Sequence, residues 1–154
     1  MSATCEANPP AWHIEYSVHN QGTAFLWLIV DESLVFRRDG SRVELCYARA
    51  RMQPNVKVFG YFNPDVIEIP AGETVRQAVE IIWPCRLSGI WNSEREANLP
   101  PGKYEVSVRI GFASTVAPEP PTVGEDVESP VLRWQEEATS SPVTLEIPAW
   151  HVVP

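Results

Sequence analysis

Three cysteines and three histidines are the side chains of this sequence best suited to nucleophilic catalysis or metal binding. A cysteine nucleophile requires a lowered thiol pKa and a nearby base, usually a histidine. Cys85 stands out because it lies in IIWPCRLSGIW, between Trp83 and Trp91. This stretch has no cysteine-hydrolase signature, and the histidines lie near the termini, at His13, His19 and His151. We therefore retain Cys85 as a candidate reactive thiol and predict no catalytic residue.

Metal binding is not indicated by the spacing of the available ligands. Zinc sites usually contain short ligand pairs such as CxxC or HxxxH, whereas Cys5, Cys46 and Cys85 are separated by 41 and 39 residues. The acidic run GEDVE lacks the alternating oxygen ligands of a calcium loop. We predict no metal and no cofactor. The alternative left open is an enzyme or metal-binding protein whose site is assembled from distant residues.

The elements that must position these residues are strands, because apolar and polar residues alternate along most of the chain. In GKYEVSVRIGF every second residue from Tyr104 to Phe112 is apolar, which is typical of a half-buried antiparallel strand. Asp39-Gly40 between two apolar runs predicts a hairpin, and Trp12 and Trp83 are in phase with core positions. The predicted strands cover residues 12–18, 24–30, 34–48 with the hairpin turn inside, 56–62, 66–69, 74–83, 103–112 and 143–147.

Two longer loops are predicted between these strands. Pro84 removes a ladder donor and ends the strand before it, so Cys85 becomes the first loop residue. The following loop, Arg86 to Pro101, is expected to hold one short helical turn at 92–97. The second loop, 117–141, contains four prolines, six acids and one base in 25 residues. Such a loop is either a solvated excursion or a partner-binding segment on a rigid scaffold.

Together these features predict an all-β fold, an immunoglobulin-like antiparallel β-sandwich of about seven or eight strands. The length of 154 residues favours a single domain, 1–154. Within it we expect a flexible N-terminus at 1–10 and the long Pro/Glu-rich loop, 117–141, between the last two strands.

The charge of the chain narrows the classes of partner. The net charge is −8, so binding to nucleic acid or to an anionic membrane surface is not expected. The N-terminal MSATCEANPP lacks the basic and apolar regions of a secretory signal, and no apolar run is long enough to span a membrane. We therefore expect a cytoplasmic protein with free thiols. The basic middle and acidic ends of the sequence are compatible with a homo-oligomer.

Candidate contact residues come from the two long loops. They are Trp91 and Arg95 in the first, and Val131, Arg133 and Trp134 around the apolar island VLRW in the second. A further group of five arginines flanks the Asp39-Gly40 hairpin. These arginines pair either with acids on neighbouring strands or with an acidic partner, and they are Arg37, Arg38, Arg42, Arg49 and Arg51.

The C-terminal half of the sequence resembles a known domain pattern. IPAGETVRQAVEI, then LPPGKYEVSVRIGF, then SSPVTLEI resemble the last strands of immunoglobulin-like domains in bacterial cytosolic proteins, including the intracellular proteinase inhibitors of the BsuPI type. The resemblance covers roughly residues 66–147. It implies the sandwich fold, and the family's inhibitory loops have no residue-by-residue match here. The expected function is a non-enzymatic protein-interaction module of unknown partner, inhibitor-like in a narrower form. A self-associating structural subunit is a further alternative.

Overall fold

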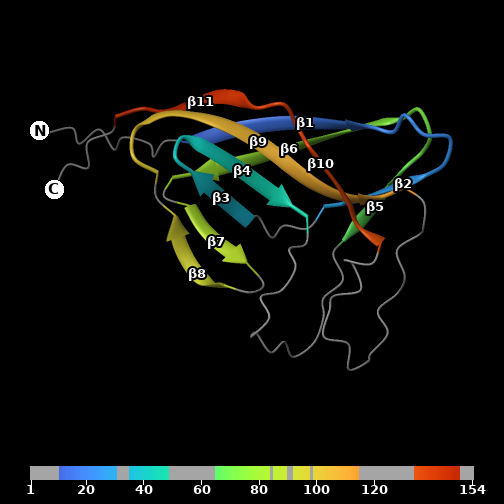
Figure 1. The fold of residues 1–154 in the computed structure, drawn as a ribbon, viewed down its shortest axis with the longest axis horizontal. Coiled ribbons are helices and arrows are strands. Elements are labelled where there is room, and N and C mark those ends of the chain that lie inside the picture. Colours follow the sequence, from blue (N-terminus) through green and yellow to red (C-terminus); the bar gives the residue numbers. More distant parts are fainter. Residues whose placement is uncertain are drawn as a thin grey trace, which may run out of the picture.

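The computed structural model describes residues 11–30, 35–48, 65–83, 85–89, 92–97, 99–114 and 134–149 (Figure 1). Side chains are described throughout these ranges except at 35–36, 85–89 and 92–97. The prediction of an all-β chain is confirmed, and the described residues form eleven strands rather than seven or eight. The predicted strand 56–62 and the N-terminal segment 1–10 lie outside the described residues. No helix in the described ranges has the length and apolar character needed to cross a membrane.

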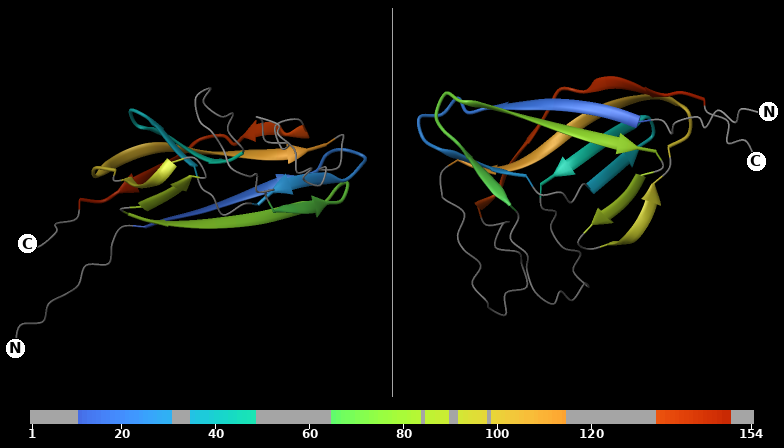
Figure 2. Two further views of the ribbon diagram at one scale, coloured as in Figure 1. Left: turned by 90° about the horizontal axis from the view of Figure 1, so that it is seen from below. Right: turned by 180° about the vertical axis from the view of Figure 1, so that it is seen from behind.

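The strands form three sheets. β1 (Ala11–His19) and β6 (Thr74–Ile82) make an antiparallel pair of nine residues each. A seven-stranded sheet has the order β3 (Val35–Asp39), β4 (Arg42–Tyr47), β9 (Gly102–Ala113), β2 (Leu26–Ile29) and β5 (Val66–Ile69), with β10 (Glu136–Thr139) and β11 (Val143–Ile147) also paired to β9. β7 (Cys85–Gly89) and β8 (Asn92–Ala97) form a separate hairpin. Figure 2 shows β1 and β6 as a layer lying against the sheet that contains β9.

The core lies between these two layers, and the alternation read from the sequence explains it. Val43 and Leu45 on β4 and Val106 on β9 are at most 1% exposed, and they belong to one buried cluster with Ile81 on β6 and with Trp83, the residue that follows β6. Trp12 on β1 meets Trp83 edge-on, with ring centroids 5.0 Å apart. The predicted core positions of both tryptophans are therefore confirmed.

The sheet is not purely antiparallel, which corrects the prediction. β4 pairs with β9 in parallel, from Arg42 opposite Glu105 to Tyr47 opposite Ile110. Parallel neighbours need a long crossover, and residues 48–101 supply it, because β5 and β6 lie between β4 and β9 along the chain. Side-chain alternation has a period of two in either direction. The pattern that identified both strands could not therefore give their relative direction.

The region after Pro84 also differs from the prediction. Cys85 is not a loop residue but the first residue of β7, opposite Ala97. The predicted helical turn at 92–97 is strand β8, so the predicted loop from Arg86 to Pro101 contains a hairpin, with an irregularity between Leu87 and Gly89. The short polar sequence of β8 has little strand character of its own. Its pairing with β7 decides the conformation, as is common where strand preference is set by context.

The predicted long loop, 117–141, ends earlier than expected. Its residues 136–139 form β10, which runs antiparallel to β9 with Glu136 opposite Phe112. The last two strands are therefore β10 and β11, and the connection between them is only 140–142. All four residues of β10 are exposed, so the strand lacks the apolar face by which the other strands were identified. Residues 115–133 lie outside the described part of the chain.

Candidate interaction site

The structure describes only part of the predicted contact set. Trp91, Val131 and Arg133 lie outside the described residues, and Arg95 is described by its backbone alone, in β8. Trp134 is described in full and is half-buried, immediately before β10. The structure therefore describes the predicted second-loop contact surface only at the two positions where the loop adjoins the sheet.

Those two ends face each other across β9 and β10. The register that places Glu136 opposite Phe112 brings Ser114 opposite Trp134 when it is extended by two residues. The backbone N–H of Ser114 donates to Glu136 Oε1 at 3.1 Å, and the Ser114 hydroxyl donates to the same oxygen. The segment 115–133 thus leaves the sheet and returns to it at one place, and a carboxylate bonded to both the main chain and the side chain of Ser114 closes that place.

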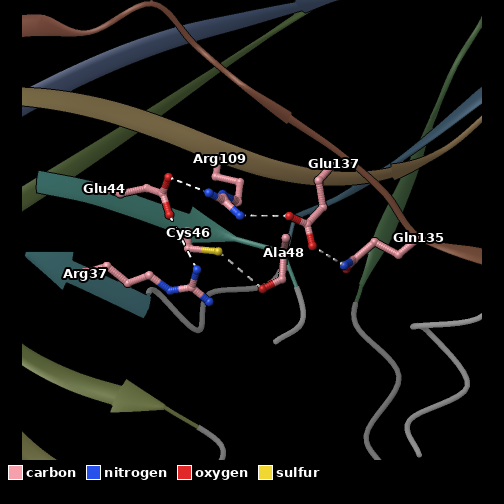
Figure 3. A network of polar contacts seen from close by, with 7 residues as sticks. All are labelled: Arg37, Glu44, Cys46, Ala48, Arg109, Gln135 and Glu137. Carbon is pink, nitrogen blue, oxygen red and sulfur yellow. Dashed lines mark hydrogen bonds and ion pairs between the residues drawn. The ribbon is translucent and has the colours of Figure 1, made fainter. Parts of the chain in front are cut away.

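A network of ion pairs connects the same end of β10 to β9 and β4 (Figure 3). Arg109 on β9 donates from Nη2 to Glu44 Oε2 on β4 at 2.9 Å and from Nη1 to Glu137 Oε2 on β10 at 3.1 Å. Arg37 on β3 lies 3.8 Å from the other oxygen of Glu44. Hydrogen bonding to Glu44, with a smaller contribution from Glu137, raises the pKa of Arg109 above its ordinary value. One guanidinium therefore ties three strands together.

Gln135 completes the attachment of β10. Its Nε2 donates to Glu137 Oε1 at 3.2 Å. Its Oε1 lies only 2.7 Å from the position that a Cβ atom would occupy at Gly111, and Ile29 Cδ1 lies 2.8 Å from the same position. A side chain at Gly111 would therefore collide with both neighbours. The glycine in β9 allows Gln135 to lie close against the sheet.

Cys46 lies beside this network and has the character of a structural thiol. It is 2% exposed, it is free, and its Sγ donates to the carbonyl of Ala48 at 3.5 Å. Burial raises the pKa of the Cys46 thiol, so the group stays protonated and is a poor nucleophile at neutral pH. The expectation of free thiols is confirmed for Cys46, whereas the reactivity of Cys85 stays a prediction.

The histidines of β1, His13 and His19, are exposed. His13 Nε2 lies 3.6 Å from Glu80 Oε1 across the β1–β6 pair, and both side chains are more than half exposed. His19 Nδ1 lies 2.9 Å from Thr74 Oγ1. A depression of about 390 Å³ lies at the middle of the same two strands, lined by Glu15, Tyr16, Ser17, Arg76, Gln77 and Ala78. Over the described residues, no group of three His, Cys, Asp or Glu side chains is placed to hold a metal ion.

The arginines of the Asp39-Gly40 hairpin are satisfied within the chain where their side chains are described. Arg37 pairs with Glu44, and Arg42 Nε lies 3.4 Å from Glu105 Oε2. Arg38 donates to the carbonyl of Gly40 and lies over the ring of Tyr104. The prediction that these arginines pair with acids on neighbouring strands is confirmed for Arg37 and Arg42, and Arg49 and Arg51 lie outside the described residues.

Comparison of the chain with protein-family models, with curated proteins and with solved structures found no match.

Proposed function

We propose that this chain is a non-enzymatic, cytoplasmic protein-interaction module that contacts its partner through residues 115–133 and the neighbouring Trp134. The observation that carries the proposal is the closure of this segment at its base by Ser114, Glu136, Glu137 and Arg109. Loops that recognise partners are commonly held by a rigid β scaffold at closely spaced ends. The bonds to β9 provide such an attachment.

The composition of the segment supports the same proposal and suggests the chemistry of the partner. Residues 115–133 carry four acids and one base, whereas at the attachment site Arg109 pairs with the carboxylates of Glu44 and Glu137. An acidic loop associates fastest with a basic protein surface, because complementary charge steers the encounter. Trp134, half-buried at the base of the loop, supplies an aromatic side chain of the kind enriched at interfaces.

For the fold we propose an immunoglobulin-like sandwich. β1 pairs with β6 in one layer, and β2 and the last strands pair with β9 in the other. This arrangement is consistent with the immunoglobulin-like topology. Tyr104, near the start of β9, donates its hydroxyl to the carbonyl of Pro100 at 2.6 Å, as in the tyrosine corner of such domains. The parallel β4–β9 pair departs from the pattern. An experimental structure that placed β1 and β6 in one sheet with β9 would contradict this assignment.

An inhibitor-like role is a narrower form of the proposal, and it is supported only by the resemblance of residues 66–147 to the BsuPI-type family. Under that form the partner would be a proteinase. The same binding experiment covers both forms, because each requires the segment 115–133.

The test is a chain in which residues 115–133 are replaced by Asn-Gly. Because the register of β9 and β10, extended by two residues, places Ser114 opposite Trp134, a two-residue hairpin turn should close the gap without disturbing β10. We expect this variant to unfold with the same cooperativity as the wild type and to lose the proteins that the wild type retains in affinity capture from native lysate. A matched control replaces the solvent-exposed turn residues Ala71 and Glu73 by other residues and keeps Gly72, whose φ of 78° favours glycine. Equal capture by the wild type and the shortened chain would sink the proposal.

A further inference from the structure

The outer edge of β6 is long, and no other described strand covers it. In the part of the chain that the structure describes, β6 pairs with β1 and with no other strand. It runs for nine residues without proline, lysine or a bulge, and its outward side chains from Thr74 to Ile82 are exposed. Ile82, with 51% of its surface accessible, is one of the exposed large apolar residues. An unpaired strand of this kind is a template for pairing with another chain.

The other edges among the described strands carry features that hinder such pairing. β3 presents the adjacent like charges Arg37 and Arg38, and β5 has only four residues and is followed by Pro70. The edge formed by β10 and β11 is interrupted at 140–142. Trp12 of β1 donates its Nε1 to the carbonyl of Glu146 on β11 at 3.2 Å, so β11 lies beside β1. Short length, charge and proline are the usual ways of blocking edge-to-edge association.

The hydrogen-bond pattern of the β1–β6 pair shows which backbone groups of β6 are directed outward. The N–H of Asn20 donates to the carbonyl of Glu73 at 3.0 Å, in register with the ladder that follows. Hydrogen-bonded residue pairs alternate with non-hydrogen-bonded pairs, so they recur at every second residue of an antiparallel ladder. The odd-numbered residues of β6 therefore bond to β1, and the even-numbered residues from Thr74 to Ile82 direct their N–H and C=O groups to the free edge.

The side chains of the same even-numbered residues are complementary to themselves. In an antiparallel pair of two β6 strands centred on Ala78, Arg76 of each copy lies directly opposite Glu80 of the other, on the same exposed face. Thr74 lies opposite Ile82, and the small Ala78 faces its own equivalent at the centre. This register also makes the even-numbered residues the hydrogen-bonded pairs, as the free backbone groups require. Opposite charges at directly facing positions stabilise such a pair.

We propose that two copies of this chain associate through β6, in a two-fold antiparallel pair centred on Ala78. The two β1–β6 pairs then form one continuous four-stranded sheet, β1–β6–β6–β1. A two-fold interface uses the same patch on both copies, which is the property that the Arg76 and Glu80 positions have. This inference rests on the proposed interaction function, because it names a second copy of the chain as one partner. It uses residues 74–82 and none of the residues 115–133.

The test is a charge swap followed by sedimentation equilibrium, with 17.3 kDa as the mass of the monomer. Arg76→Glu alone and Glu80→Arg alone each place like charges opposite each other twice in the dimer. We expect either change to raise the dissociation constant of the dimer by roughly tenfold to thirtyfold. The double variant Arg76→Glu/Glu80→Arg restores opposite charges and should return the constant to within about threefold of the wild type. Glu15→Arg, an equal charge change on the outer face of β1, is the matched control.

Circular dichroism verifies that each variant is folded. A wild-type chain that sediments as a monomer up to millimolar concentration, or a double variant no tighter than the single ones, overturns the inference. The chain with 115–133 replaced by Asn-Gly should dimerise like the wild type. Loss of dimerisation in the charge variants with partner capture intact, and loss of capture in the shortened chain with the dimer intact, therefore separate the two proposals.

Discussion

Replacement of Arg109 by methionine should destabilise the protein, and the size of the effect follows from the contacts of one guanidinium. Methionine keeps much of the aliphatic length and removes the charge. Glu44, whose side chain is 20% exposed, then retains only the longer contact to Arg37, and Glu137 loses its partner on β9. The matched variant Arg42→Met removes an ion pair to Glu105 in which the two side chains are 79% and 55% exposed.

The expected magnitudes differ because the environments differ. A hydrogen bond to a charged group in a partly buried site contributes about 1.5–3 kcal/mol, whereas an exposed pair contributes about 0–1 kcal/mol. The bond from Arg109 to Glu44 belongs to the first class, and the bond to the more exposed Glu137 belongs to the second. The buried Nε of Arg109 has no hydrogen-bond partner among the described residues, and removing it recovers about 1 kcal/mol. The net loss for Arg109→Met should be about 1–2 kcal/mol, against less than about 0.5 kcal/mol for Arg42→Met.

Urea unfolding measures both losses, and thermal unfolding should show Arg109→Met about 3–6 °C below the wild type for a chain of this size. A double-mutant cycle between Arg109 and Glu44 should give a coupling of about 1 kcal/mol or more, and the cycle between Arg42 and Glu105 should give less than about 0.5 kcal/mol. Amide exchange should accelerate in β10, because Glu137 loses its attachment to β9. Equal losses for the two arginine variants would refute the assignment of Arg109 as the residue that ties β4, β9 and β10 together.

Two further predictions concern a partly buried tyrosine and a buried asparagine. Burial, and to a smaller extent the nearby Tyr16, raise the pKa of Tyr47, so the stability it contributes is complete below about pH 10 and is lost as pH rises above that value. Urea unfolding from pH 8 to 11.5 should therefore show a shallower alkaline loss for Tyr47→Phe, by up to about 1.4 kcal/mol per pH unit, and parallel curves for the two proteins would contradict this. Asn20, 3% exposed, donates to the carbonyls of Ala24 and Ile69 at 2.8 Å and accepts from the N–H of Gly22. Asn20→Ala should cost about 2–3 kcal/mol in urea unfolding, whereas its exposed neighbour Gln21→Ala should stay within about 0.5 kcal/mol, and similar losses for both would show that Asn20 does not join the two loops.

The strands that could be predicted from the sequence are those with one buried face. Alternating apolar residues identified β1, β6, β9 and β11, and glycine after Asp39 identified the turn between β3 and β4, where Gly40 has a φ of 60°. The double burial of Leu28 and Ile29 agrees with the apolar run on both faces of β2. Each of these strands contributes its own apolar side chains to the core, such as Trp12, Ile81, Val106 and Ile147. The local pattern therefore carried enough information.

β7, β8 and β10 could not be predicted, because their sequences lack the alternating apolar residues that mark the other strands. The side chains of β10 are exposed, and the strand is held by Arg109, Ser114 and its backbone pairing with β9. These partners are more than 20 residues away in the sequence, so no local pattern reports them. The same limit applies to the ion-pair network. The five arginines around the hairpin form a visible cluster in the sequence, but Arg109, which makes the shortest ion pair among the described residues, is a single polar position in an alternating strand.

The attachment of β10 also explains how the chain can carry a long acidic segment without loss of order in the sheet. Glu136 and Glu137 are adjacent, and on a strand they face opposite sides, so each can bind a different group of β9: Ser114 at the end of the strand and Arg109 four residues before its last residue. A pair of acids that is poorly arranged for acid–base catalysis is thus well arranged to fix an edge strand at two points. Since both points lie before the segment 115–133 begins or after it ends, the length and sequence of that segment can change without altering the bonds that hold it. This separation of scaffold and segment is the physical basis for expecting recognition in the loop and stability in the sheet.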